Sequence, residues 1–118
     1  MALTVYGIPN CGTVKKARAW LDARDVAHAF HDFRTAPVAA ERVKAWVAAL
    51  GAKALKNTSG GSYRALPEDK KTWSDAQWAE AMAADPMLIK RPVIERDGAV
   101  VQAGFRGTDD VLAARLLG

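Results

Sequence analysis

Cys11 is the only cysteine in the 118-residue chain, and it has the surroundings of a reactive thiol. It stands between a short apolar stretch, Leu3 to Tyr6, and a helical pattern that opens at Gly12. The unpaired N–H groups of a first helical turn and the helix dipole stabilise an anion, and a thiolate is such an anion. Lys15 and Lys16 add positive charge one turn on, so we predict a lowered pKa and a reactive Cys11 thiol.

The alternative for Cys11 is a buried cysteine that serves as a small apolar side chain. Its neighbours Asn10 and Gly12 favour a turn near the surface over deep burial. A single cysteine also excludes an internal disulfide framework, a CxxC redox pair and an all-cysteine metal site. Any thiol cycle of this chain therefore requires a thiol from outside.

Three other groups of residues could carry chemistry, and each has a simpler structural explanation. His28 and His31 point to opposite faces at the period of a strand, so we predict no metal site. The pair Asp109-Asp110 suits the first turn of a helix. Two of the four tryptophans, Trp20 and Trp46, fall at core-flanking helix positions, where packing explains them better than stacking on bases.

The net charge of +4 is spread unevenly along the sequence. Residues 1–64 hold ten Lys or Arg against four Asp or Glu, whereas residues 65–118 hold seven against nine. A basic half can serve nucleic acid or a small anion. No basic run exceeds two residues and no aromatic residues alternate with such a run, so we predict no direct nucleic-acid binding.

The elements that must position Cys11 follow from the spacing of apolar residues. Strands are predicted at Leu3–Tyr6 and Ala27–Phe33, with a helix between them. The inward side of that helix is Val14, Ala17 and Leu21. A further helix is predicted at Glu41–Leu50, closed by Gly51, with a short turn over Ala52–Lys56 after it.

The remaining elements are marked by turn and capping residues. Asn57–Ser62 is a loop by composition, and Ser74 with Gln77 forms a capping box for a helix that ends near Asp85. Asp97-Gly98 joins the strands 92–95 and 99–102 as a hairpin. Thr108 caps a last helix. We expect the apolar side of that helix to be Val111, Leu112 and Leu116.

This order of elements predicts an α/β fold built as one domain over residues 1–118. The strand–helix–strand opening gives a parallel pair and the hairpin adds antiparallel strands, so we expect a four-stranded mixed sheet flanked by helices. Residues 37–86 form a helical insertion. The chain has no signal peptide and no run of ~18 apolar residues, so we expect a cytoplasmic monomer without membrane contact.

Several segments, in order from Leu3 to the end of the chain, resemble the arsenate-reductase-like (ArsC) family of the thioredoxin superfamily. The likeness is greatest to the YffB-type branch, which is grouped with the Spx and MgsR regulators. The matching segments are Asn10-Cys11-Gly12-Thr13-Val14-Lys15-Lys16-Ala17, His31-Asp32-Phe33-Arg34, Ala54-Leu55-Lys56-Asn57-Thr58, Tyr63-Arg64-Ala65-Leu66, Ile89-Lys90-Arg91-Pro92-Val93 and Gly104-Phe105.

The resemblance implies a thioredoxin-like fold and a cis peptide bond before Pro92. It implies that Cys11 is the nucleophile and that Arg91, Arg64 and Arg106 hold an oxyanion, since the forked donors of arginine match its oxygens. Asn10, Lys15 and Pro92 belong to the same implied site. Glutathione is the implied co-substrate, with glutaredoxin as a protein partner and no tightly bound cofactor.

One departure from the family bears on the substrate. Related proteins usually carry an arginine in the loop where this chain has Asn57-Thr58-Ser59-Gly60, and here only Lys56 is basic. Lysine is a point charge and cannot grip an oxyanion through two parallel hydrogen bonds. We therefore expect a glutathione-dependent thiol reaction, with a glutathione carboxylate in the cationic pocket, rather than arsenate reduction.

The resemblance also implies a second kind of function. The Spx branch binds RNA polymerase and regulates transcription, and that activity belongs to a surface rather than to a thiol pocket. Spx proteins typically carry a Cys-x-x-Cys switch, whereas this chain has Val14 at the second position. The sequence therefore favours the enzyme over the regulator.

Overall fold

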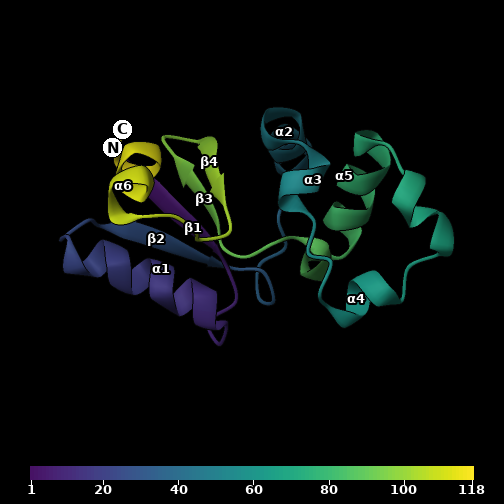
Figure 1. Ribbon diagram of the computed structural model, residues 1–118, viewed down its shortest axis with the longest axis horizontal. Helices are drawn as coiled ribbons and strands as arrows, with labels where there is room; N and C mark the ends of the chain where they lie inside the picture. The colour runs from purple at the N-terminus through teal and green to yellow at the C-terminus, as the bar shows by residue number, and fades with distance from the viewer. The chain divides into compact units, whose positions relative to one another are not determined.

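The computed structural model describes all residues from 1 to 118, and their contacts group them into two compact units. Unit 1 comprises Met1–Ala36 and Arg91–Gly118, and unit 2 comprises Pro37–Lys90 (Figure 1). Each unit has its own core and is described by itself. The assignment of the whole chain to one domain stays a prediction. None of the helices combines the length and the apolar character needed to cross a bilayer.

Unit 1 is built on the predicted four-stranded mixed sheet. Its strands are β1 (Leu3–Gly7), β2 (His28–Asp32), β3 (Val93–Arg96) and β4 (Ala99–Ala103), in the order β2-β1-β3-β4. β1 pairs parallel with β2 and antiparallel with β3, and β3 pairs antiparallel with β4. The predicted hairpin is confirmed: Asp97 and Gly98 both have positive φ, as the tightest hairpin turns require.

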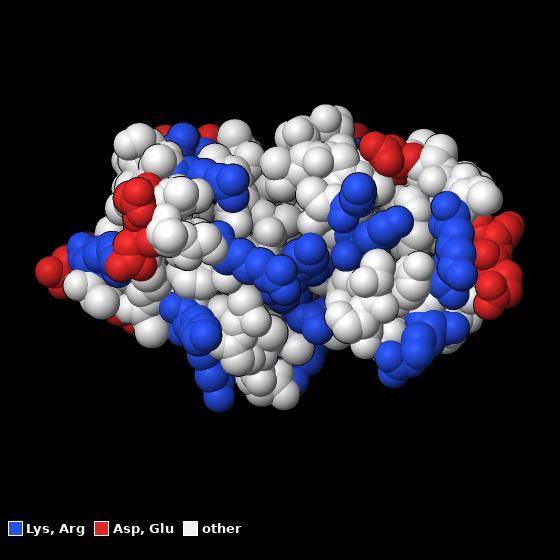
Figure 2. Space-filling model, in the orientation of Figure 1, with Lys and Arg blue, Asp and Glu red and all other residues white.

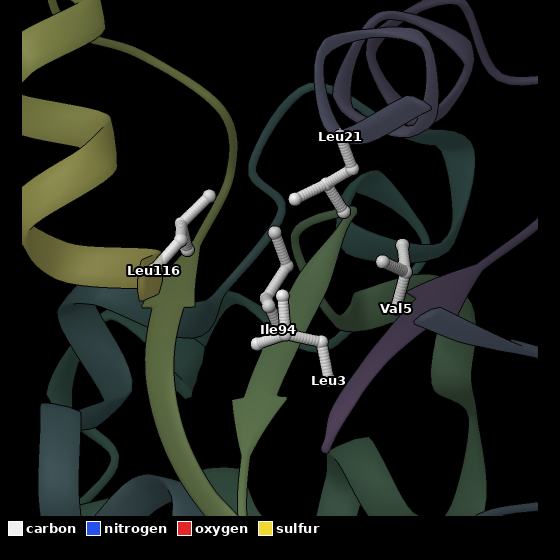
Figure 3. Packing of buried hydrophobic residues seen from close by; sticks show 5 residues of the cluster. All are labelled: Leu3, Val5, Leu21, Ile94 and Leu116. Carbon is white, nitrogen blue, oxygen red and sulfur yellow. The ribbon is translucent and has the colours of Figure 1, made fainter. Parts of the chain in front are cut away.

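Two helices, α1 (Gly12–Ala23) and α6 (Asp109–Leu117), pack on one face of this sheet. Figure 3 shows Leu21 of α1 and Leu116 of α6 directed toward the same strand residues. The cluster consists of Leu3, Val5, Leu21, Ile94 and Leu116. The predicted inward residues of α1 are all buried.

One expectation for α6 is wrong. Leu112 and Leu116 are buried, but Val111 is 40% exposed. Residues four apart lie on one side of a helix, whereas neighbouring residues are about 100° apart, so the burial of Leu112 and Leu116 turns Val111 outward. Thr108 stands at the N-cap as predicted, yet its side chain makes no hydrogen bond to the helix N–H groups.

The two histidines lie on opposite faces of β2, as predicted. His28 is paired with Leu3 of β1 and its ring nitrogen Nε2 accepts from Arg18 Nε at 3.4 Å. His31 is paired with Tyr6, and the centroids of those two rings are 4.8 Å apart. The two imidazoles therefore cannot share one ion without distortion of the strand.

Unit 2 is helical, and its main contact is between two helices of similar length. These are α2 (Ala40–Leu50), closed by Gly51 at φ +85°, and α5 (Asp75–Ala84). The predicted capping box of α5 is confirmed, since Ser74 and Gln77 exchange side-chain hydrogen bonds with backbone N–H groups. The shorter elements are α3 (Ala52–Leu55), α4 (Gly61–Arg64), η1 (Glu68–Thr72) and η2 (Pro86–Leu88).

The loop predicted at residues 57–62 is partly wrong, because the helical turn α4 begins at Gly61 within it. Arg64 Nη1 donates to the Ser59 carbonyl at 3.0 Å and ties this turn to the loop before it. The prediction that tryptophans serve packing is confirmed at both helix positions. Trp46 is 1% exposed, and Trp20 packs against the core cluster of unit 1.

Candidate functional site

Cys11 lies where β1 gives way to α1, in the position that the sequence predicts. β1 ends at Gly7, and the Cys11 N–H donates to the Ile8 carbonyl at 3.3 Å to close the turn. Gly7 is required here, because a Cβ at that position would lie 2.7 Å from Val14 Cγ2. This close approach of strand and helix holds Cys11 at the N-cap of α1, half-buried.

The surroundings of Cys11 favour the thiolate over the thiol. Partial burial raises the pKa of Cys11, but the backbone N–H groups of Val14 and Thr13 and the Arg91 guanidinium lower it, and the net pKa is below the usual value. The Cys11 side chain, at the N-cap of α1, makes no capping hydrogen bond of the kind that a serine hydroxyl makes. The N–H groups of the first turn nevertheless lie close enough to stabilise charge on sulfur.

Arg91 is brought to Cys11 by the segment that leads into β3. The peptide bond between Arg91 and Pro92 is cis, which confirms the expectation drawn from the family resemblance. Pro92 is buried, and its carbonyl accepts from the Gly104 N–H at 2.7 Å. The Arg91 guanidinium, through hydrogen bonding and its positive charge, lowers the pKa of the Cys11 thiol.

Asn10 and Lys15 flank Cys11 along the chain, and both are exposed. The backbone N–H of Lys15 donates to the Cys11 carbonyl at 3.0 Å, which is the first hydrogen bond of α1. Its ammonium group therefore sits one turn into the helix, at the surface. Arg91 is the one charged side chain that lowers the pKa of the Cys11 thiol, so the expected contribution of the lysine charges stays a prediction.

The other two predicted arginines lie elsewhere in the chain. Arg106 is exposed, and with Lys16 it lines a surface hollow of about 490 Å³ in unit 1. Arg64 is exposed on α4 of unit 2. The structure thus brings Arg91 to Cys11 and brings Arg106 to Lys16. The shared role of the three arginines at one anion stays a prediction.

The uneven charge of the sequence does not map onto the two units. Unit 1 holds nine Lys or Arg against seven Asp or Glu, and unit 2 holds eight against six. Figure 2 shows basic side chains over both parts of the visible face. The positive character near Cys11 comes from Arg91 and from the Thr13 and Val14 N–H groups of the first turn of α1. No three His, Cys, Asp or Glu side chains are grouped as a metal site would require.

Some contributors to the site have no side-chain signal in the sequence. The donors from Thr13 and Val14 are backbone groups, so only the predicted helix start indicates them. The hollow beside Arg106 was missed altogether, because Trp20 and Phe105 are far apart in the sequence. Their ring centroids are 6.0 Å apart in an edge-on arrangement.

Comparison with known proteins shows which family the chain resembles. The family model described as "ArsC family" matches residues 6–113. The structure of the YFFB (PA3664) protein is 39% identical, covers 97% of this chain and 98% of its own, and superposes with a TM-score of 0.85. A possible arsenate reductase from Streptococcus mutans UA159 is 37% identical over 93% of this chain and 96% of its own, with a TM-score of 0.81.

A regulator is also among the relatives. The global transcriptional regulator Spx of Streptococcus agalactiae serotype V is 29% identical over 105 residues, which are 87% of this chain and 76% of the regulator. The structural likenesses confirm the predicted thioredoxin-like fold with a four-stranded mixed sheet and flanking helices.

Proposed function

The chain belongs to the ArsC family, and we propose that it is a glutathione-dependent thiol oxidoreductase whose nucleophile is the Cys11 thiolate. The observation that carries the proposal is the set of donors at the Cys11 sulfur, from Val14, Thr13 and Arg91, which lower its pKa. The thiolate is the form that attacks disulfides and electrophilic centres. The similarity to a possible arsenate reductase supports thiol redox chemistry in general for this chain.

The proposed step is a thiol–disulfide exchange with glutathione disulfide. The Cys11 thiolate attacks one sulfur, a new bond forms between Cys11 and a glutathionyl group, and the old disulfide bond breaks. The leaving glutathione thiolate takes a proton from solvent. A second thiol, on a protein such as glutaredoxin, loses its proton to solvent and attacks the glutathionyl sulfur of the mixed disulfide. A new disulfide forms between that protein and glutathione, the bond to Cys11 breaks, and the Cys11 thiolate is released.

Arg91 has two roles in this proposal. Its charge stabilises the thiolate before attack, and its forked donors suit a carboxylate of glutathione or a small oxyanion. Lys15 adds a point charge at the surface, and Asn10 and Pro92 shape the turns on either side. Arg64 and Arg106 are proposed as further anion ligands. The reaction needs no tightly bound cofactor.

The test is the formation of a mixed disulfide on Cys11. Incubation of the reduced protein with glutathione disulfide is expected to add one glutathionyl group by intact mass, and peptide mapping is expected to locate it on Cys11. Cys11→Ser should add none, and Arg34→Ala, which removes an exposed arginine paired with Asp32, should behave as the wild type. Absence of an adduct while the free thiol still reacts with a small alkylating agent would refute the proposal.

A transcriptional regulator that binds RNA polymerase is the second candidate, favoured by the likeness to Spx. Val14 stands where those regulators carry the second cysteine of their switch, and it is 1% exposed and packed close to Gly7. A thiol switch within one chain is therefore absent. Specific retention of RNA polymerase on the immobilised chain, surviving Cys11→Ser, would favour the regulator.

A further inference from the structure

A surface hollow in unit 1 lies between α1 and the loop that leads into α6. We call it the α1–α6 hollow. It has a volume of about 490 Å³ and is lined by Lys16, Ala19, Trp20, Phe105, Arg106, Gly107, Asp109 and Leu112. Trp20 and Phe105 meet edge to face, and both are only partly buried. An aromatic surface of this kind is left accessible in a unit whose other large apolar residues are mostly buried.

The apolar surface continues past the edge of the hollow. Val111 is, with Met1, one of the two large hydrophobic residues that are clearly exposed. It adjoins Gly107, since a Cβ built at that glycine would lie 3.4 Å from Val111 Cγ1. Gly107 lines the hollow, so the exposed Val111 side chain lies next to a residue at its edge.

The charges at the rim are unbalanced. Asp109 is already engaged: its Oδ1 accepts from the Trp20 indole N–H at 3.1 Å and its Oδ2 lies 3.1 Å from Arg24. Arg24 in turn lies over the Trp20 ring, 3.9 Å from its centroid. Lys16 and Arg106 are exposed and form no ion pair. The hollow therefore offers two unused positive charges beside an aromatic floor.

We propose that the α1–α6 hollow is a docking site for an acidic segment of a partner protein, one that inserts a phenylalanine or leucine side chain between flanking carboxylates. Tryptophan, tyrosine and arginine dominate the binding energy of protein interfaces, and charge complementarity selects the partner. Most lining residues are exposed, so the hollow is too open to bury most of a small ligand. An open apolar floor with a charged rim is the anatomy of a protein interface.

The position of the hollow connects it to the thiol, and this connection rests on the proposed function. Lys16 follows Cys11 by five residues, which is about 7.5 Å along a helix axis. A standard interface covers about 800 Å² on each partner and is much wider than that distance. A protein seated on the hollow therefore lies within reach of Cys11 and of a thiol adduct on it.

The test uses a synthetic peptide with one phenylalanine between two pairs of aspartates, titrated into the full-length ¹⁵N-labelled chain at low ionic strength. We expect saturable shifts of the amides of Lys16 and Trp20, the Trp20 indole and residues 105–109. Added salt should weaken binding, because exposed charges are screened. The double variant Lys16→Glu, Arg106→Glu should bind at least about tenfold more weakly, because two attractive pairs become repulsive.

A matched control changes the same charge elsewhere. Lys53→Glu with Lys71→Glu replaces two exposed lysines of unit 2 and should keep the wild-type affinity. Cys11→Ser should also bind normally, which separates this proposal from the thiol chemistry. Four outcomes would each overturn the proposal. A peptide with lysines in place of the aspartates could bind equally well, or the shifts could be confined to unit 2. An oligonucleotide could bind more tightly at the same residues, or the shifts could depend on protein concentration without any peptide.

Discussion

Unit 1 and unit 2 use their positive side chains in different ways. In unit 1, Arg91 is directed at a sulfur that can carry negative charge. In unit 2, the ammonium groups of Lys56 and Lys70 lie over aromatic rings, 5.0 Å from the Trp78 centroid and 4.7 Å from the Tyr63 centroid. Lys70 is only 6% exposed, so its ring contact and its bond to a backbone carbonyl replace water.

This difference indicates where the chemistry resides. Every group that changes the pKa of Cys11 belongs to unit 1: the thiol, the first turn of α1 and Arg91. The lysine and aromatic contacts of unit 2 are internal to that unit and satisfy its own buried charge. Activation of the thiol therefore depends on the fold of unit 1, while unit 2 contributes a separately packed helical body.

The largest expected effect tests whether the two cores are separate. Leu21→Ala removes a fully buried side chain of unit 1 and Met82→Ala one of unit 2. Each should lower the free energy of unfolding by about 2–5 kcal/mol, because a cavity remains where packing is lost. Amide hydrogen exchange should accelerate most in β1 and β3 for the first variant and in α2 and α5 for the second. Equal acceleration in both units for both variants would mean that the chain unfolds as one body.

The next effect concerns the thiol itself. Arg91→Ala removes a hydrogen bond and a positive charge from the Cys11 sulfur, so the pKa of the thiol should rise. The reactive Cys11 thiolate predominates above the pKa of this thiol in the folded protein, and it is lost as pH falls through that pKa. Alkylation near neutral pH should slow by roughly tenfold, and the pH profile should move upward. Lys53→Ala in unit 2 should leave the profile in place; a profile unmoved by Arg91→Ala would show that the helix N-terminus acts alone.

Much of unit 1 could be predicted from local signals. Gly7 and Gly12 mark the two ends of the turn at Cys11, and the Asp97-Gly98 pair predicts the hairpin. Apolar residues spaced three and four positions apart from Val14 onward predict α1. These signals work because each acts over a few residues. The contact of Cys11 with Arg91 joins positions eighty residues apart, and only the family resemblance indicated it.

The parts that could not be predicted depend on distant partners. The turn α4 begins inside a stretch whose composition is that of a loop, and a hydrogen bond to Ser59 ties it there. Val111 faces outward because Leu112 and Leu116 take the buried side, a choice that the apolar pattern leaves open. Burial of Lys70 has no local signal either, since it requires the ring of Tyr63.

A smaller effect distinguishes the two ways in which these units begin a helix. Ser74 and Gln77 form a complete capping box in unit 2, whereas Thr108 in unit 1 makes no capping hydrogen bond. Ser74→Ala should therefore lower the free energy of unfolding by about 1 kcal/mol, and Thr108→Ala by clearly less. Urea denaturation of both variants measures the difference. Equal losses would mean that Thr108 caps its helix in solution.

The smallest expected effect is a pH dependence at the start of α6. The Thr108 hydroxyl and then the Asp110 N–H hold the pKa of the Asp110 carboxyl below its usual range; slight desolvation opposes them, and the Val111 N–H lowers the pKa a little further. Because the folded pKa lies below the unfolded value of ~3.9, ionised Asp110 stabilises the folded chain above that pH, and the contribution is lost as pH falls through the folded pKa. The Tm difference between wild type and Asp110→Asn should therefore be steady at neutral pH and shrink in acid. Thr108→Val should reduce it, and so should salt, because the carboxyl is fully exposed. A Tm difference that stays constant down to about pH 2 would show that the carboxylate contributes nothing through its charge.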